Sequence, residues 1–195
     1  MPFSKVQIYN LALNNLGVSA TIQNVSQQDV KTSTLNAVYN VALEQTLKDF
    51  DWNFASTYIA LTLTGNTCLN PKYLYEYDYP NECLSAREIV DASQKNIPFE
   101  PASNASGQRI INTNAYPAVL RCTRLISNEI YFTVEFVTAL SWYLAFMSAE
   151  TITGSSGKRE KALSIYSGLV EKSMVANATE GFQEEDITIP WLEAR

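Results

Sequence analysis

Residues 132–153 read FTVEFVTALSWYLAFMSAETIT, and this stretch decides the predicted fold. Its apolar side chains surround almost the whole circumference of a helix. One side carries Phe132, Phe136, Leu140, Tyr143 and Met147, and the rest carries Val137, Trp142, Leu144 and Phe146. A helix of this kind needs cover on several sides. Either its sister helices supply that cover, or the surplus face, with Trp142 and Phe146, is a contact between subunits.

Three further helices are predicted on either side of this stretch. Residues 4–16 begin with the capping-box pair Ser4 and Gln7 and end at Gly17, where a C-terminal cap belongs. Residues 27–50 and 158–178 each place apolar residues on one stripe and charged residues opposite it. We expect the N-terminal and C-terminal helix pairs to close into one four-helix bundle.

The periodicity changes between the second and third predicted helices. Apolar residues alternate over 55–63, and β-leaning runs follow at 84–90, 109–112 and 119–126, separated by prolines. The predicted fold class is therefore mainly α with a β insertion (α+β), in which a small antiparallel β lobe is inserted between helices two and three. The Ser-, Asn- and Pro-rich residues 92–107 are expected to form a loop, either a plain surface loop or one that projects from the lobe.

These patterns divide the chain into three predicted parts. The helical bundle takes residues 1–54 and 127–178, the β-rich insertion lobe takes 55–126, and an extended C-terminal arm takes 179–195. The stretch between Glu135 and Glu150 is too short and too interrupted by Ser and Thr to span a membrane. With no basic and apolar leader after Met1, we expect synthesis in the cytoplasm and no membrane partner.

The composition excludes several kinds of enzyme. The chain has no His, so it cannot use a Ser-His-Asp or Cys-His mechanism, and it lacks the commonest zinc ligand. Cys68, Cys83 and Cys122 are too widely spaced for a metal or redox motif, and no nucleotide-binding motif is present. We therefore predict no catalytic residue, no cofactor and no bound metal. A net charge of −6 without clustered Lys or Arg also argues against adhesion to DNA.

Two segments are candidate contact surfaces. Tyr73, Tyr75, Tyr77 and Tyr79 alternate as they would along an extended strand, which predicts a row of phenols packed against a neighbouring subunit or stacked on a carbohydrate or peptide. After residue 179 an acidic run, Glu184, Glu185 and Asp186, leads into an apolar segment. That tail either folds back on its own domain or is an arm that binds a partner by strand addition, with an aromatic anchor. The arm interpretation takes as partner-binding residues Ile187, Ile189, Pro190, Trp191, Leu192 and Arg195.

The whole pattern resembles the head-to-tail adaptors of tailed bacteriophages, in particular the tail tubular protein A type of short-tailed phages. The matching strings run nearly from end to end: YNLALNNLG at 9–17, DWNFA at 51–55, YDYPNECL at 77–84, RCT at 121–123 with the helix after it, and WLEAR at 191–195. The departures lie around 92–107 and in the tail.

This resemblance implies a structural virion protein of the neck, assembled in the host cytoplasm. In this family the subunits form a ring, a dodecamer, that binds beneath the portal protein and offers its other face to the nozzle or another tail protein. Genomic DNA passes through the lumen without specific binding, and lumen-facing carboxylates would repel its phosphates. The alternative is a virion-associated enzyme that degrades glycans with carboxylates of the β lobe, such as Glu76, Asp78, Glu82 and Glu88.

Overall fold

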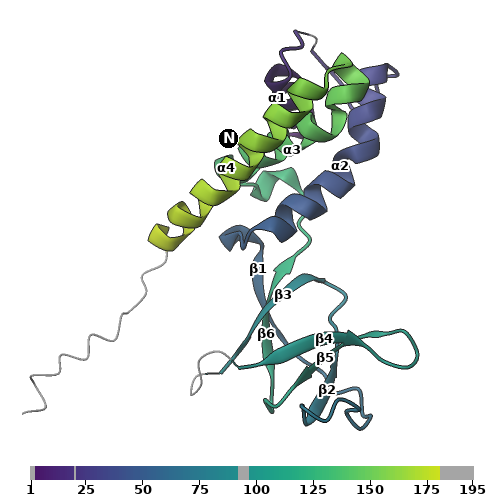
Figure 1. Cartoon of the computed structure of the whole chain (residues 1–195), viewed down its shortest axis with the longest axis vertical. Helices are drawn as coiled ribbons and strands as arrows, with labels where there is room; N and C mark the ends of the chain where they lie inside the picture. The colour runs from purple at the N-terminus through teal and green to yellow at the C-terminus, as the bar shows by residue number, and fades with distance from the viewer. Residues whose placement is uncertain (1–2, 20, 92–96, 181–195) are drawn as a thin grey trace, which may run out of the picture.

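The computed structural model describes residues 3–19, 21–91 and 97–180, with helices at one end of the molecule and strands at the other (Figure 1). The helices are α1 (Lys5–Asn15), α2 (Val30–Asp49), α3 (Val134–Thr153) and α4 (Ser156–Glu180). The strands are β1 (Ser56–Ala60), β2 (Tyr75–Asp78), β3 (Cys83–Val90), β4 (Phe99–Ser103), β5 (Arg109–Thr113) and β6 (Val119–Arg124). Short 3-10 turns, η1 (Asn53–Ala55) and η2 (Glu129–Tyr131), stand at the two crossings between the ends.

The α3 helix is the centre of the helical end. It packs against α1, α2 and α4, and the other helix pairs touch each other only slightly within the described ranges. Phe136, Leu140 and Leu144 are fully buried, as expected for a helix that is apolar on nearly every side. The sister helices therefore supply most of the cover that this helix needs.

Local signals set the helix ends. Ser4 and Gln7 form the predicted capping box, in which the Ser4 side chain accepts from the Gln7 backbone and the Gln7 side chain accepts from the Ser4 backbone at 2.9 Å. Gly154 ends α3 in the left-handed conformation, with φ of +65°, which glycine adopts at little cost. The four predicted helices are all present, with their ends within three residues of the expected positions.

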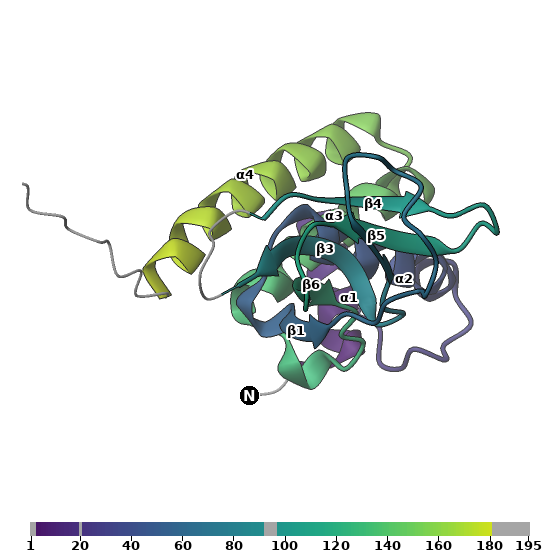
Figure 2. The same cartoon turned by 90° about the horizontal axis from the view of Figure 1, so that it is seen from below.

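The strands form two separate antiparallel sheets. One has the order β1-β6-β3 and lies next to the helices, and the other has the order β2-β5-β4 and lies beyond it (Figures 1 and 2). A second hydrophobic core, distinct from that of the helices, joins the sheets around Tyr77, Ile111 and Leu120. Both sheets are small, so each depends on the other to bury its apolar face.

The predicted fold class is wrong and needs correction. The six strands follow α2 and make two separate three-stranded antiparallel sheets, whereas one small antiparallel sheet was predicted. The helices surround α3 and do not close into a regular four-helix bundle. The segment expected to be a loop at 92–107 contains β4, an exposed edge strand that tolerates Pro101 because an edge needs no donor on its outer side. Within the described ranges, no helix has the length and hydropathy needed to cross a membrane.

Candidate functional site

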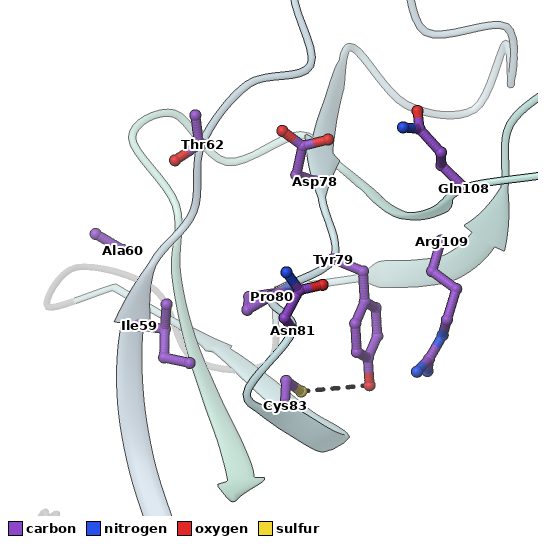
Figure 3. A pocket seen from close by; sticks show the side chains of 10 residues that line it. All are labelled: Ile59, Ala60, Thr62, Asp78, Tyr79, Pro80, Asn81, Cys83, Gln108 and Arg109. Carbon is purple, nitrogen blue, oxygen red and sulfur yellow. Dashed lines mark hydrogen bonds between the residues drawn. The ribbon is translucent and has the colours of Figure 1, made fainter. Parts of the chain in front are cut away.

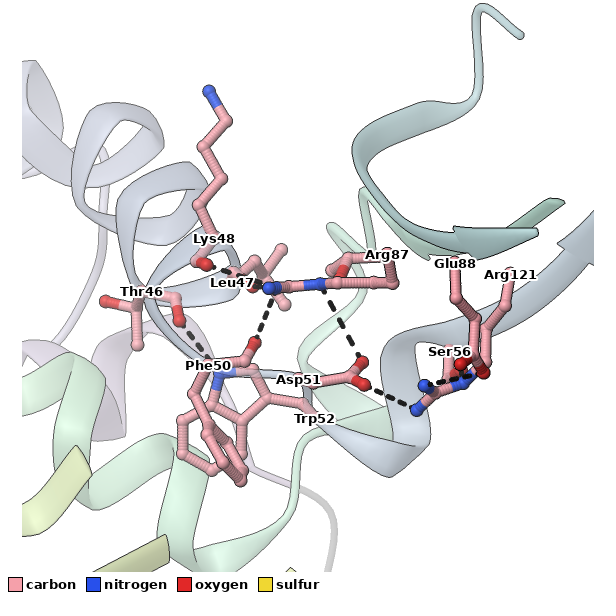
Figure 4. Close-up of polar contacts among 11 residues, drawn as sticks. Thr46, Leu47, Lys48, Phe50, Asp51, Trp52, Ser56, Arg87, Glu88 and Arg121 are labelled. Atoms are coloured by element: carbon pink, nitrogen blue, oxygen red, sulfur yellow. Dashed lines mark hydrogen bonds and ion pairs between the residues drawn. The ribbon is translucent and has the colours of Figure 1, made fainter. Parts of the chain in front are cut away.

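The helical end and the sheets meet at a polar junction around Asp51 (Figure 4). Arg87, from β3, reaches the C-terminal turn of α2 and donates through one nitrogen, Nη2, to three carbonyl oxygens. These belong to Leu47 at 3.3 Å, Lys48 at 3.1 Å and Phe50 at 2.9 Å. Carbonyls at a helix end have no partner within the helix, and the end carries partial negative charge. The guanidinium therefore caps α2 and joins it to the sheet.

A second arginine extends the junction to β1 and β6. Arg121 pairs with Asp51 and with Glu88 at 3.3 Å, and its Nε donates to Ser56 Oγ at 3.1 Å. Burial alone would lower the pKa of Arg121, but the two carboxylates outweigh burial and raise it. The Asp51 carboxylate also lies 3.9 Å from Arg87 Nε, so one acid lies between two cations.

Trp52 anchors the junction on its helical side. Its indole Nε1 donates to the Thr46 carbonyl at 2.8 Å, and its ring packs edge-on against Phe50 at 4.9 Å and Phe136 at 5.1 Å. Trp52 is buried in the helical core, and Asp51 is ion-paired with arginines of the sheet. Two consecutive residues therefore contact both ends of the molecule. The junction therefore connects the helices to the neighbouring sheet.

A groove of about 680 Å³ lies on the sheet side of this junction (Figure 3). It separates β1 from the segment that follows β2, and its lining comprises Ile59, Ala60, Thr62, Asp78, Tyr79, Pro80, Asn81, Cys83, Gln108 and Arg109. The Asp78 backbone still donates to the Thr62 carbonyl at 2.9 Å, but the two segments diverge from there. Pro80 has no N–H with which to continue the pairing.

Arg109 and Tyr79 lie next to each other in the lining of the groove (Figure 3). The guanidinium lies 3.6 Å from the centre of the Tyr79 ring, and the Cys83 thiol donates to the Tyr79 hydroxyl at 3.3 Å. Burial, and after it the neighbouring Cys83, raises the pKa of Tyr79 to about 12, although Arg109 acts in the opposite direction. A cation stacked on an aromatic face keeps its edge free for an anion.

A second hollow, of about 500 Å³, shares Asn81, Cys83 and Arg109 with the lining of the groove and is also lined by residues of α2. Its charged lining residues are Glu44, Lys48, Glu82, Arg109 and Arg124. Arg124 pairs with Glu82 at 3.3 Å, whereas no carboxylate among the described residues lies within ion-pair distance of Lys48 or Arg109. This hollow therefore holds two unneutralised cations in an acidic protein.

The predicted contact residues differ in how much of their side chain is exposed. Tyr73, Tyr77 and Tyr79 are 6%, 1% and 8% exposed, so these phenols pack within the chain and leave little surface for a neighbouring subunit. Tyr75 is half-buried and stacks on Tyr116, with ring centres 5.3 Å apart.

Two other predicted contact residues, Trp142 and Phe146, are half-buried against the helical core and keep part of their surface free. Outside the described residues lie Ile187, Ile189, Pro190, Trp191, Leu192 and Arg195, together with Glu184, Glu185 and Asp186.

The four carboxylates of the enzyme alternative have separate surroundings. Glu76 is 5% exposed and accepts from Thr64 Oγ1 at 2.9 Å, whereas Glu82 and Glu88 are paired with arginines. Asp78 is exposed and lines the groove. In the part of the chain that the structure describes, no three His, Cys, Asp or Glu side chains are placed to hold a metal ion.

The chain matches no protein-family model and no curated protein sequence. Its site is therefore interpreted from its own chemistry. The sequence analysis missed Arg87, Lys48 and Arg109, because each acts through a contact with a residue more than 25 positions away or faces a groove that only the folded chain creates.

Proposed function

We propose that this protein is the subunit of a head-to-tail adaptor ring, a structural component of a tailed phage that joins the portal to the nozzle or another tail protein. The observation that carries the proposal is the Asp51 junction, which connects a helical end to a sheet end through ion pairs and hydrogen bonds. An adaptor must bind one component at each end and transmit force between them. The resemblance in sequence supports the same role.

Exposed apolar side chains near the crossing that leads into α3, and others in the region of the sheets, are candidate contact surfaces for such partners. At the start of α3, Ile130, Tyr131 and Val134 are 61%, 65% and 63% exposed. In the region of the sheets, Leu69 and Leu74 are 81% and 73% exposed. Large exposed side chains of this kind commonly mark binding surfaces when they gather in one place.

The proposal also states where the ring lies in the virion and how DNA passes through it. The ring would sit in the neck of the virion after assembly in the host cytoplasm, with DNA passing through its lumen and no cofactor bound. A net charge of −6 suits a channel for DNA, because lumen-facing carboxylates repel phosphates. Exchanging acidic for basic residues on the lumen side would then slow DNA ejection.

The glycan-degrading alternative has less support. A glycosidase needs two carboxyl groups that flank one sugar-binding cleft. Of the four candidates only Asp78 is exposed in the groove, and Glu76 is buried beneath a hydrogen bond from Thr64. No observation in the described chain favours catalysis at these residues.

The test is electron microscopy of the full-length protein mixed with its candidate portal, after light scattering has given the mass of each alone. We expect a ring stacked on the portal. A chain that lacks Ile187–Arg195 should keep the circular dichroism of the full-length protein but lose attachment. Separate particles at every salt and protein concentration tried would overturn the proposal, and normal attachment of the shortened chain would remove the role of the arm.

A further inference from the structure

We propose that Cys83 and Cys122 form a redox site that reacts with small anionic disulfides, such as oxidised glutathione, and ends as a disulfide bond between β3 and β6. Both cysteines are unbridged in the structure. They are far apart in the sequence, but the pairing of the two strands brings them together. The inference does not depend on the adaptor role. It rests on the register of the strands, on the access of Cys83 to the groove and the second hollow, and on the charge of that hollow.

The first observation is the register of β3 against β6. Cys83 pairs with Arg124, and Cys122 lies two positions before Arg124, so the two cysteines are diagonal neighbours on one face of the sheet. Both belong to the core that joins the two sheets. The register shifts between Cys83 and Ser85, and the backbone at such a bulge departs from the regular ladder. The bulge therefore allows β3 to adjust when the two sulfurs move to bonding distance.

The two thiols also interact with each other. Burial, and after it the neighbouring Cys83, raises the pKa of Cys122 to about 12. Cys83 acts both through its charge and through a side-chain hydrogen bond, which requires the two side chains to be close together.

The second observation is that only one of the two thiols borders a hollow. Cys83 contributes to the lining of both the groove and the second hollow, and its thiol donates to the Tyr79 hydroxyl at 3.3 Å (Figure 3). Cys122 is fully buried and lines neither. An incoming reagent therefore meets Cys83 first, and Cys122 lies behind it as the resolving thiol.

The third observation is the charge beside Cys83. Lys48 and Arg109 line the second hollow without a carboxylate partner among the described residues, and the pair of Arg124 with Glu82 lies beside them. Such cations attract a reagent that carries carboxylates and raise its local concentration. Reactive cysteines typically lie in electropositive surroundings of this kind. The hollow, of about 500 Å³, has the size of a small-molecule site.

The reaction consists of two exchange steps. In the first, the Cys83 thiolate attacks one sulfur of the small disulfide and breaks its S–S bond, and the released small thiolate takes up the proton that Cys83 lost. In the second, the Cys122 thiolate attacks the Cys83 sulfur, forms the bond between the strands and releases the second small thiol with the proton of Cys122. Two protein thiols are oxidised while one external disulfide is reduced to two thiols, so no other oxidant is needed.

The experiment treats full-length C68S protein with oxidised glutathione and follows its intact mass. The C68S change removes the third thiol, which is half-buried and hydrogen-bonded to Asn112. We expect a mixed disulfide at Cys83 first, and then a product two hydrogens lighter than the reduced protein, with Cys83 joined to Cys122 in the peptide map. Because the high pKa of Cys122 keeps its thiolate scarce, the second step should become about 10-fold faster for each unit of pH between about 7 and about 9.

Variants of the C68S protein separate the two steps and the role of charge. C122S should stop at the mixed disulfide, and C83S should give neither product. K48Q should slow the first step by about 3-fold with oxidised glutathione but not with cystamine, a cationic disulfide. R159Q, which removes a cation from the exposed pair with Glu150 on α3 and α4, should react at the unchanged rate. Circular dichroism checks that each variant folds, and if C83S does not, the peptide map still identifies the cysteine that reacts first.

Three results would overturn the inference. One is that the thiols of the folded protein stay reduced under conditions that oxidise the urea-unfolded chain. Another is a final product that carries glutathione on both cysteines and has no bond between Cys83 and Cys122. The third is an equal rate for K48Q and R159Q with oxidised glutathione, which would remove the preference for anionic disulfides.

Discussion

Replacing Arg87 by Met should lower the free energy of unfolding by about 3.5 kcal/mol. The change keeps most of the apolar stem and removes the guanidinium, which donates to four oxygens. Three of these hydrogen bonds are partly buried, those to Leu47, Phe50 and Thr123, and the fourth, to Lys48, is exposed. At about 1 kcal/mol for each partly buried bond and about 0.5 kcal/mol for the exposed one, the loss reaches that figure. For a chain of this length it corresponds to a fall in Tm of about 7–14 °C.

The measurement is urea unfolding followed by tryptophan fluorescence, since Trp52 lies at the junction itself. Arg159→Met is the matched control, because Arg159 pairs with Glu150 at 3.0 Å with both side chains about half exposed. An exposed pair of this kind contributes less than about 1 kcal/mol. If R87M and R159M unfold at the same urea concentration, the guanidinium does not hold the two ends together and the reasoning fails.

Two further changes test other parts of the structure. Asn10→Ala should destabilise the protein by about 2 kcal/mol, because the Asn10 side chain both accepts from and donates to the backbone of buried Ile22, at 2.8 and 2.9 Å; Gln45→Ala, on an exposed helix face, is the control in the same urea assay. Stability should also fall as pH rises from about 10 to about 12, since the pKa of Tyr79 is raised from 10.0 to about 12 and the folded protein keeps a proton that the unfolded chain releases. Tyr79→Phe should make that fall shallower, and equal slopes for the two proteins would contradict the assignment.

The helices could be predicted from sequence because their signals are local. The capping box at Ser4, the glycines at 17 and 154 and the apolar stripes all act within a few residues of where they stand. What could not be predicted was how the helices pack. A helix that is apolar all round requires neighbours but does not specify them, so a regular bundle and the observed arrangement around α3 were equally consistent with its sequence.

The sheets and the site depended on contacts between distant residues. Within their sheet the short strands β2 and β4 each pair with β5, and neither Glu76 nor Pro101 is typical of a strand interior. The row of tyrosines was predicted to be extended, and β2 is indeed a strand, but its phenols face a core that exists only once both sheets are formed. Lys48 and Arg109 are separated by 61 positions in sequence, so no pattern brings them to one hollow.

The central position of α3 has a consequence for the order in which a newly made chain can fold. During synthesis α1 and α2 leave the ribosome first, yet both pack mainly against a helix that begins at Val134. Their apolar faces therefore stay exposed to solvent until the whole β region has been translated. The strands, whose partners all lie between Ser56 and Arg124, can pair with one another before that moment. A polypeptide released before residue 134 would leave the apolar faces of α1 and α2 exposed. Translation arrest in this interval should therefore promote aggregation.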